Sequence, residues 1–224
     1  MKKQIVVIGL GRFGSRLAVT LTNLGHEVLA IDKREDRVNR LAARVTKAVQ
    51  ADTTSENVLR ELGVGNFDVG IVAIGYDPMS SILSATLLKK LGVRYIVARA
   101  QDELHGEILS RVGADMVVNP EIEMGARIAQ STTFAEIVDH MEIGETYGVS
   151  KLLAPAYFDG RTLAELGFGR LGAADHIVLL IQRRQEIIII PERSQIVHSG
   201  DVLVIAGPDE TLERLLDDAK KKDR

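Results

Sequence analysis

The residues Gln4-Ile-Val-Val-Ile-Gly-Leu-Gly-Arg-Phe-Gly14 join an apolar, strand-like run to a Gly-x-Gly-x-x-Gly motif. Gly9 allows a tight turn from strand to helix, Gly11 lets the backbone approach a phosphate, and Gly14 lets the helix pack closely on the sheet. The phosphates of a nucleotide would then lie at the helix N-terminus. A second strand ends at Asp32, about 20 residues on, where a carboxylate can accept hydrogen bonds from ribose hydroxyls. This stretch therefore predicts a nucleotide site.

The composition is that of a globular protein, since 46% of the 224 residues are apolar, enough for one large or two modest domains. The net charge is −3, so no overall positive field favours nucleic acid as a partner. The absence of cysteine excludes disulfides and thiol chemistry and suits a cytoplasmic protein. We see no signal peptide, and the apolar runs are much shorter than the roughly 20 residues of a membrane span. We therefore expect a soluble chain that reaches a membrane only through a partner.

The first half alternates apolar strands with amphipathic helices, a pattern typical of repeated βαβ units. Strands are predicted over 4–8, 27–31, 47–50, 69–74, 95–98 and 116–118, and helices over 12–24, 34–44, 55–62, 79–91 and 103–112. Right-handed crossovers between parallel strands give the doubly wound α/β (Rossmann) fold, whose ligand crevice lies at the carboxyl ends of the strands. The loops after Ile8, Ile31, Gln50, Ile74 and Ala98 are therefore expected to meet at one cleft.

The pattern changes after Pro120. One helix is predicted over 121–139, with an interruption near 131–133, and strands follow over 148–154, 177–183, 187–190 and 201–206. A polar hairpin turn over 182–186 and a closing helix over 211–220 complete the second part. We therefore expect three segments, a Rossmann domain over 1–120, a connecting crossover helix over 121–139 and a smaller α+β C-terminal domain over 140–224.

Basic and acidic residues lie in the predicted crevice loops. Arg12, inside the glycine motif, would add a guanidinium to the phosphate site, which favours ATP or ADP. Arg99, at the end of the fifth strand, can serve the same end or form an ion pair with a neighbouring acid. Asp52 can contact adenine or cap the helix that begins near Thr54. Glu121 stands at a helix start, where the helix dipole already favours a carboxylate.

Asp32 also bears on the choice of nucleotide. An acid at this position disfavours a ribose 2′-phosphate by charge repulsion, although two basic residues, Lys33 and Arg34, follow immediately. The glycine motif and Asp32 equally allow an NAD(H)-dependent oxidoreductase or an NAD-sensing regulator. The five histidines are scattered and pair with no acid at a catalytic or metal-binding spacing, so we expect no catalytic residue and no enzyme.

Five segments together carry a resemblance to a known family. They are Gly-Leu-Gly-Arg-Phe-Gly, Ala-Asp-Thr-Thr after the third strand, Val-Ala-Arg-Ala-Gln around Arg99, Gly-Ala-Asp-Met-Val-Val-Asn-Pro-Glu around Glu121, and the strand-rich C-terminal part. This set resembles the cytosolic regulatory subunits of bacterial Ktr and Trk potassium uptake systems, built from the domain that regulates potassium conductance (RCK, or KTN). The Ktr type is the more similar, because it has one such unit.

The resemblance implies a regulator that binds ATP or ADP, forms a ring of eight subunits and docks on the cytosolic face of a potassium-translocating membrane subunit. It places Arg12 and Arg99 at the phosphates, Asp32 at the ribose and Asp52 on the adenine side. It also makes Glu121 a ligand for a divalent cation, Mg²⁺ or Ca²⁺, at a dimer interface. The expected nucleotide site comprises Gly9, Gly11, Arg12, Phe13, Gly14, Asp32, Lys33, Asp52, Thr53, Ala73, Ile74, Gly75 and Arg99.

Some members of this family bind cyclic di-AMP in an apolar cleft of the C-terminal domain. Pro191 and the apolar run over 177–181 fit that pattern. The polar element that should precede the strand is replaced by Gly167-Phe-Gly-Arg-Leu171, which speaks against cyclic di-AMP as a ligand.

Overall fold

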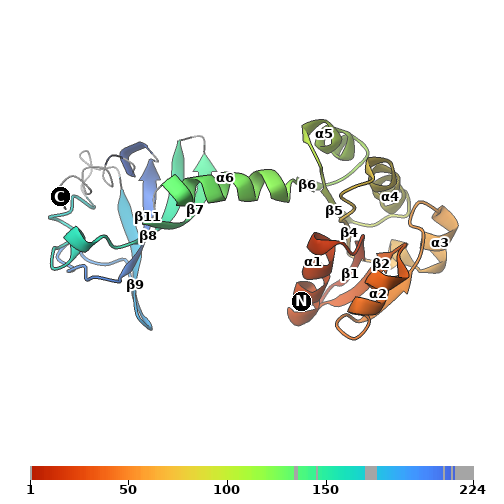
Figure 1. Ribbon diagram of the computed structural model, residues 1–224, viewed down its shortest axis with the longest axis horizontal. Coiled ribbons are helices and arrows are strands. Elements are labelled where there is room, and N and C mark those ends of the chain that lie inside the picture. Colours follow the sequence, from red (N-terminus) through yellow and green to blue (C-terminus); the bar gives the residue numbers. More distant parts are fainter. Residues whose placement is uncertain are drawn as a thin grey trace. The chain divides into compact units, whose positions relative to one another are not determined.

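The computed structural model describes residues 2–133, 136–144, 146–169, 176–208, 210–212 and 214. The chain divides into two compact units, Met1–Glu121 and Ile122–Arg224. Each unit has its own β-sheet, and Figure 1 labels most of the strands and helices of both.

The first unit is built on a sheet of six parallel strands in the order β3-β2-β1-β4-β5-β6. The strands are β1 (Gln4–Ile8), β2 (Glu27–Asp32), β3 (Lys47–Gln50), β4 (Val69–Val72), β5 (Tyr95–Arg99) and β6 (Met116–Val118). The helices between them are α1 (Arg12–Asn23), α2 (Glu35–Leu41), α3 (Glu56–Glu61), the short η1 (Val64–Asn66), α4 (Pro78–Lys90) and α5 (Glu103–Arg111). This order reverses between β1 and β4, and it confirms the predicted doubly wound sheet.

Both faces of this sheet are covered by apolar side chains. In β1, Val6 and Ile8 pack in one buried cluster, and Ile5 and Val7 pack in another. Successive side chains of a strand point to opposite faces, so the continuous apolar run of β1 supplies both clusters. β1 therefore lies in the interior, with its carboxyl end fixed by its two neighbours.

The glycine motif holds α1 against the end of β1. Gly9 has φ +92° and donates its N–H to the Ile31 carbonyl at 2.8 Å. A Cβ on Gly14 would lie 1.9 Å from the Gly9 carbonyl oxygen and 2.9 Å from the Ala73 Cβ. Only a residue without a side chain permits this approach, which places the N-terminus of α1 directly over the strand end.

The second unit contains α6 (Pro120–Thr133), except for its first two residues, which belong to the first unit. It also contains an antiparallel sheet in the order β10-β9-β11-β8-β7. The strands are β7 (Ile137–Gly144), β8 (Tyr147–Leu153), β9 (Ile177–Arg183), β10 (Glu186–Ile189) and β11 (Val202–Pro208), and a short helix, η2 (Ala156–Phe158), follows β8. This smaller sheet agrees with the predicted C-terminal fold. Most of the predicted closing helix over 211–220, and residues 170 and 171, lie outside the described residues.

The predicted helix over 121–139 is wrong in its last part. The helix ends at Thr133, where the sequence analysis expected only an interruption, and β7 begins at Ile137. β7 forms an antiparallel hairpin with β8, in which Ile137 faces Leu152 and Gly144 faces Tyr147. This pairing is a tertiary effect that overrides the local helical pattern. The predicted division into three segments stays a prediction. Its connecting helix, however, ends at Thr133 and not at residue 139.

A buried ion pair fixes the turn that precedes β11. Asp201 is buried and accepts hydrogen bonds from the Arg183 guanidinium at 2.7 and 2.9 Å and from the His198 N–H at 2.9 Å. Burial raises the pKa of Asp201, but these hydrogen bonds outweigh that effect and leave the pKa below its ordinary value. The carboxylate is thus a structural group of the second unit.

We predict that Gly14→Ala destabilises the protein by about 2 kcal/mol or more, because the new Cβ meets the backbone of Gly9. The matched control is Gly11→Ala in the same motif, where a Cβ would meet nothing within 4 Å. Urea unfolding of the two variants measures the difference. Equal unfolding free energies for both variants would contradict the proposed packing role of Gly14.

We predict that Asp201→Asn lowers the unfolding free energy by about 2 kcal/mol at pH 7, since it weakens hydrogen bonds to a charged group. The folded pKa is depressed, so the stabilisation is present above the unfolded pKa of about 3.9 and is lost as the pH falls through the lower folded value. Denaturant titrations of both proteins from pH 7 to pH 3 check this. The gap between them should narrow only below about pH 4; a gap independent of pH would refute it.

Candidate functional site

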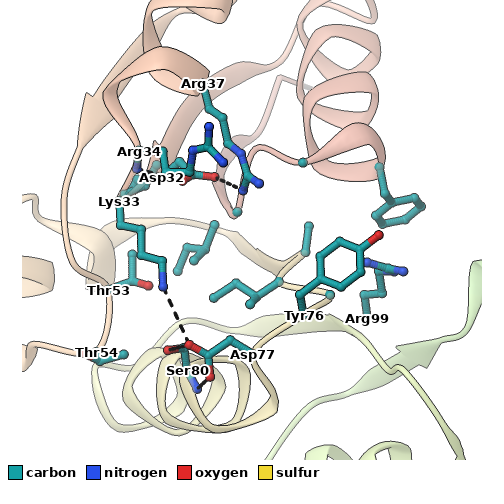
Figure 2. Close-up of a pocket in the computed structure, with 18 of the residues that line it drawn as sticks. Asp32, Lys33, Arg34, Arg37, Thr53, Thr54, Tyr76, Asp77, Ser80 and Arg99 are labelled. Atoms are coloured by element: carbon teal, nitrogen blue, oxygen red, sulfur yellow. Dashed lines mark hydrogen bonds and ion pairs between the residues drawn. The ribbon is translucent and has the colours of Figure 1, made fainter.

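A cavity of about 710 Å³ lies at the carboxyl ends of the parallel strands (Figure 2). Its walls come from the β1–α1 turn, the loops after β2, β3 and β4, and the end of β5. The residues lining it are Ile8, Gly9, Gly11, Arg12, Phe13, Ile31, Asp32, Lys33, Arg34, Arg37, Ala51, Asp52, Thr53, Thr54, Ala73, Ile74, Gly75, Tyr76, Asp77, Ser80, Arg99 and Glu121. All the expected nucleotide-site residues except Gly14 are among them, and Gly14 is buried behind the turn.

Asp32 ties the glycine turn to the loop after β2. Its Oδ2 accepts a hydrogen bond from the Leu10 N–H at 2.7 Å and lies 3.1 Å from the Arg37 Nη1. Its Oδ1 accepts from the Arg34 N–H at 2.9 Å. The side chain is 4% exposed, and each carboxylate oxygen has two acceptor sites. Oδ1 therefore keeps one acceptor site that no hydrogen bond within the described residues uses.

Nine lining residues were not among the expected site residues: Ile8, Ile31, Arg34, Arg37, Ala51, Thr54, Tyr76, Asp77 and Ser80. Asp77 caps α4 by accepting from the Ser80 N–H at 3.1 Å, and its Asp-Pro sequence was the one available signal for this position. Figure 2 shows Lys33 and Asp77 pointing toward each other from opposite walls, 3.7 Å apart. These groups set the charge at the end of the cavity formed by the β2 loop and α4.

Asp52 does not cap a helix. α3 begins at Glu56, and Asp52 instead accepts hydrogen bonds from the N–H and hydroxyl of Thr54 at 2.9 and 2.7 Å. The hydroxyl and backbone of Thr54 lower the pKa of Asp52. Next to it, the buried Thr53 hydroxyl hydrogen-bonds to the Ser84 hydroxyl at 2.9 Å. The Thr54 bonds hold the Asp52 carboxylate in a charged form within the exposed loop.

Arg99 and Glu121 form an ion pair at the other end of the cavity. The Arg99 side chain is only 12% exposed, and its Nη1 packs against Gly75, where a Cβ would lie 1.6 Å away. The sequence analysis left two roles open for Arg99, a contact with phosphate or an ion pair with an acid. In the structure Arg99 forms the ion pair and also lines the cavity. Arg12 is exposed and forms no ion pair within the described part of the chain.

No group of three or more Asp, Glu or His side chains among the described residues could hold a metal ion. His105 is buried, which lowers its pKa, and its Nδ1 accepts from the Gln101 N–H at 3.2 Å. This histidine does not line the cavity. Within the described ranges, no helix is both long and apolar enough for a membrane span.

The arrangement suits an anionic ligand with an extended shape. The volume lies within the usual range of about 300–1,000 Å³ for small-molecule sites. The N-terminus of α1 offers unpaired N–H groups and a positive dipole end, and Arg12 stands beside them. At the far end, Asp32 and the β3 loop offer acceptors for hydroxyl and amino groups. A nucleotide carries the complementary groups, with phosphates at one end and hydroxyl and amino groups at the other.

Family comparisons cover both units. Residues 5–120 match the TrkA-N domain and residues 150–219 match the TrkA-C domain. Ktr system potassium uptake protein C of Bacillus subtilis is 39% identical over 92% of this chain and 93% of its own length. Ktr system potassium uptake protein A of the same organism is 37% identical over 95% of both chains.

Among solved structures, the GsuK channel bound to NAD superposes with a TM-score of 0.64 at 20% identity, over 96% of this chain. GsuK bound to ADP superposes with a TM-score of 0.52 at 22% identity, over 61% of this chain. This chain spans 39% and 36% of those longer chains, so the likeness establishes the fold alone.

We predict that Asp32→Ala destabilises the protein by about 1–3 kcal/mol, because it leaves the buried Leu10 N–H without its partner. Asp52→Ala is the control, since among the described residues this exposed carboxylate hydrogen-bonds only to the neighbouring Thr54. Its loss should lower the unfolding free energy by less than about 1 kcal/mol. Chemical denaturation without added ligand measures both. A larger loss for Asp52→Ala would show that Asp32 is not the structural anchor of the turn.

Proposed function

Because this chain belongs to the family with a TrkA-N domain followed by a TrkA-C domain, which includes the Ktr potassium uptake proteins, we propose that it is a regulatory subunit of a potassium transporter. In this proposal the subunit senses adenine nucleotides, ATP and ADP, and transmits their identity to a membrane partner. The observation that carries it is the cavity over the glycine turn, which joins a phosphate-type end to a ribose-type end.

The proposed nucleotide lies with its phosphates on α1 and its ribose beside Asp32. The turn supports this orientation, since Gly11 has room for a Cβ and leaves its backbone open to a ligand. Asp32 keeps one acceptor site for a ribose hydroxyl. GsuK, a channel with the same fold, is described as bound to NAD and to ADP, which supports a nucleotide in this type of cleft. NAD or NADH therefore remains an alternative ligand.

Discrimination between ATP and ADP requires a group that contacts only the additional phosphate. Arg12 fits this role because it lies on the first turn of α1 and has no acidic partner among the described side chains. A ligand shifts a conformational equilibrium only by its difference in affinity for the two states. Contact of Arg12 with the third phosphate would supply that difference, about 1–3 kcal/mol per site in typical allosteric coupling.

Arg99 links the ligand to Glu121. A phosphate that pairs with Arg99 competes with the Glu121 carboxylate, so binding would release Glu121 from its ion pair. Arg99 lies against Gly75 and has little freedom to move, whereas the Glu121 side chain is exposed and can turn away. We propose this exchange of partners as the first response of the protein to its ligand.

The residues that the structure describes do not by themselves fit a divalent cation. Glu121 is held by Arg99, and no cluster of three candidate ligands occurs among the described residues. Mg²⁺ and Ca²⁺ take six or more oxygen ligands, which Glu121 alone cannot supply. Glu121 as a cation ligand stays a prediction that needs nucleotide phosphates or a second subunit to complete the site.

A membrane partner and self-association are supported by the relatives and by exposed apolar surface. The two relatives from Bacillus subtilis are named as parts of a potassium uptake system. In the second unit, Ile187, Ile189 and Ile190 are exposed on and beside the edge strand β10. Contiguous exposed apolar side chains mark association sites. We propose an oligomer, a ring of eight in the most specific form, attached to the cytosolic face of its membrane partner.

The proposal is tested with purified full-length protein. Thermal shifts with ATP, ADP, NAD and NADH identify the ligand, light scattering gives the number of subunits, and co-purification with a detergent-solubilised potassium-translocating subunit tests the partner. Stabilisation by ATP and ADP together with co-purification is expected. Selective stabilisation by NADH, without a membrane partner, would instead favour an NAD(H)-dependent protein.

We predict that Arg12→Ala weakens ATP binding about tenfold and ADP binding much less, because a charge-assisted hydrogen bond to the third phosphate is lost. Isothermal titration calorimetry with both nucleotides measures the ratio of affinities. Arg94→Ala is the control, because Arg94 is exposed and does not line the cavity. An unchanged ATP-to-ADP ratio in Arg12→Ala would remove Arg12 from the mechanism.

A further inference from the structure

A second cavity, of about 550 Å³, lies in the first unit and is lined mainly by residues of α1 and α2. Five of its lining residues are arginines: Arg12, Arg16, Arg37, Arg40 and Arg44. No Asp or Glu lines it. We call this cavity the arginine groove. Such a concentration of one charge is unexpected in a chain whose net charge is −3.

The positive charge of the groove is only partly neutralised by neighbouring acids. Arg37 pairs with Asp32 at 3.1 Å, and Arg40 pairs with the exposed Asp36 at 3.4 Å. The side chains of Arg12, Arg16 and Arg44 form no ion pair with the described residues. Several guanidinium groups on one wall therefore keep donors available, and guanidinium donors match phosphate oxygens in geometry.

The groove is continuous with the nucleotide cavity. Gly11, Arg12, Arg37 and Tyr76 line both. Arg37 stands at the shared wall with its guanidinium on the Asp32 carboxylate, as Figure 2 shows. In doubly wound folds an acid at this position binds the ribose 2′-hydroxyl, and a nearby arginine accommodates a 2′-phosphate. This chain has both groups, and Arg37 offsets the charge by which Asp32 alone would repel a phosphate.

We propose that the arginine groove binds an additional phosphate carried on the ribose of the nucleotide, so that a 2′-phosphorylated adenine nucleotide binds more tightly than the same nucleotide without that phosphate. This proposal rests on the proposed function, because it places the rest of the nucleotide in the first cavity. It also reverses the expectation from sequence that Asp32 disfavours a 2′-phosphate. A phosphate dianion could reach the arginine groove in two ways, either as the 2′-phosphate of a bound nucleotide or as free inorganic phosphate.

The test is calorimetry of the full-length protein with two ligand pairs, AMP against adenosine 2′,5′-bisphosphate and NAD against NADP. In each pair the 2′-phosphorylated member should bind about tenfold more tightly, the gain expected from one charge-assisted hydrogen bond. The double variant Arg16→Ala/Arg44→Ala should lose this preference and keep the affinity for AMP and NAD, because neither residue lines the nucleotide cavity.

The matched control is Arg60→Ala/Arg111→Ala, which removes the same charge from exposed positions that line neither cavity. This control should still bind the 2′-phosphorylated ligand of each pair more tightly. Loss of that preference in the control would mean that the net charge of the protein causes the preference, and it would overturn the assignment to the groove. Equal or weaker binding of the 2′-phosphorylated ligands, with ADP still bound, overturns this inference alone.

A third arm separates the two sources of phosphate. Inorganic phosphate is titrated into the protein and into Arg16→Ala/Arg44→Ala. Binding that depends on these two arginines, without any gain from the 2′-phosphate, assigns the groove to a free anion and overturns the proposal. Absence of binding by all the nucleotides, ATP and ADP included, overturns both this inference and the proposed function.

Discussion

The structure of the first unit depends on one close approach, between the backbone of Gly14 in α1 and the carbonyl oxygen of Gly9. A single methyl group at Gly14 would lie 1.9 Å from that oxygen, so α1 can sit on the strand end only without a side chain there. β1 is fixed in turn by its pairings with β2 and β4. The steric constraint therefore sets the position of the helix N-terminus, of Arg12 and of the cavity.

The fold of the first unit could be predicted because its local and tertiary signals agree. Glycines, helix caps at Asp77 and Asp102, and apolar strands all point to the same six-stranded sheet. The error over 121–139 arose where the two kinds of signal differ. Residues 134–139 carry no glycine or proline to end a helix, and β7 exists because β8 offers it a partner. Such a partner is not visible in a local pattern.

The site could be predicted only as far as position along the chain determines it. The loops after parallel strands must meet at one edge, so Asp32, Asp52 and Arg99 could be placed around one cavity. Their partners could not be predicted, because pairings such as Asp32 with Leu10 or Arg99 with Glu121 depend on side-chain geometry. Arg37 escaped notice for the same reason, since only the turn of α2 brings it back onto Asp32.

In the proposed binding mode, Glu121 competes with the ligand for Arg99, because the two side chains already form an ion pair. Any ligand that recruits Arg99 must first displace a carboxylate already held beside it at high local concentration, and this lowers the apparent affinity. A singly charged anion gains little binding free energy when it replaces the Glu121 carboxylate on Arg99. A polyphosphate gains more, because it makes several contacts at once. In the proposed binding mode, Glu121 would therefore favour highly charged ligands and set the ligand concentration at which Arg99 changes its partner.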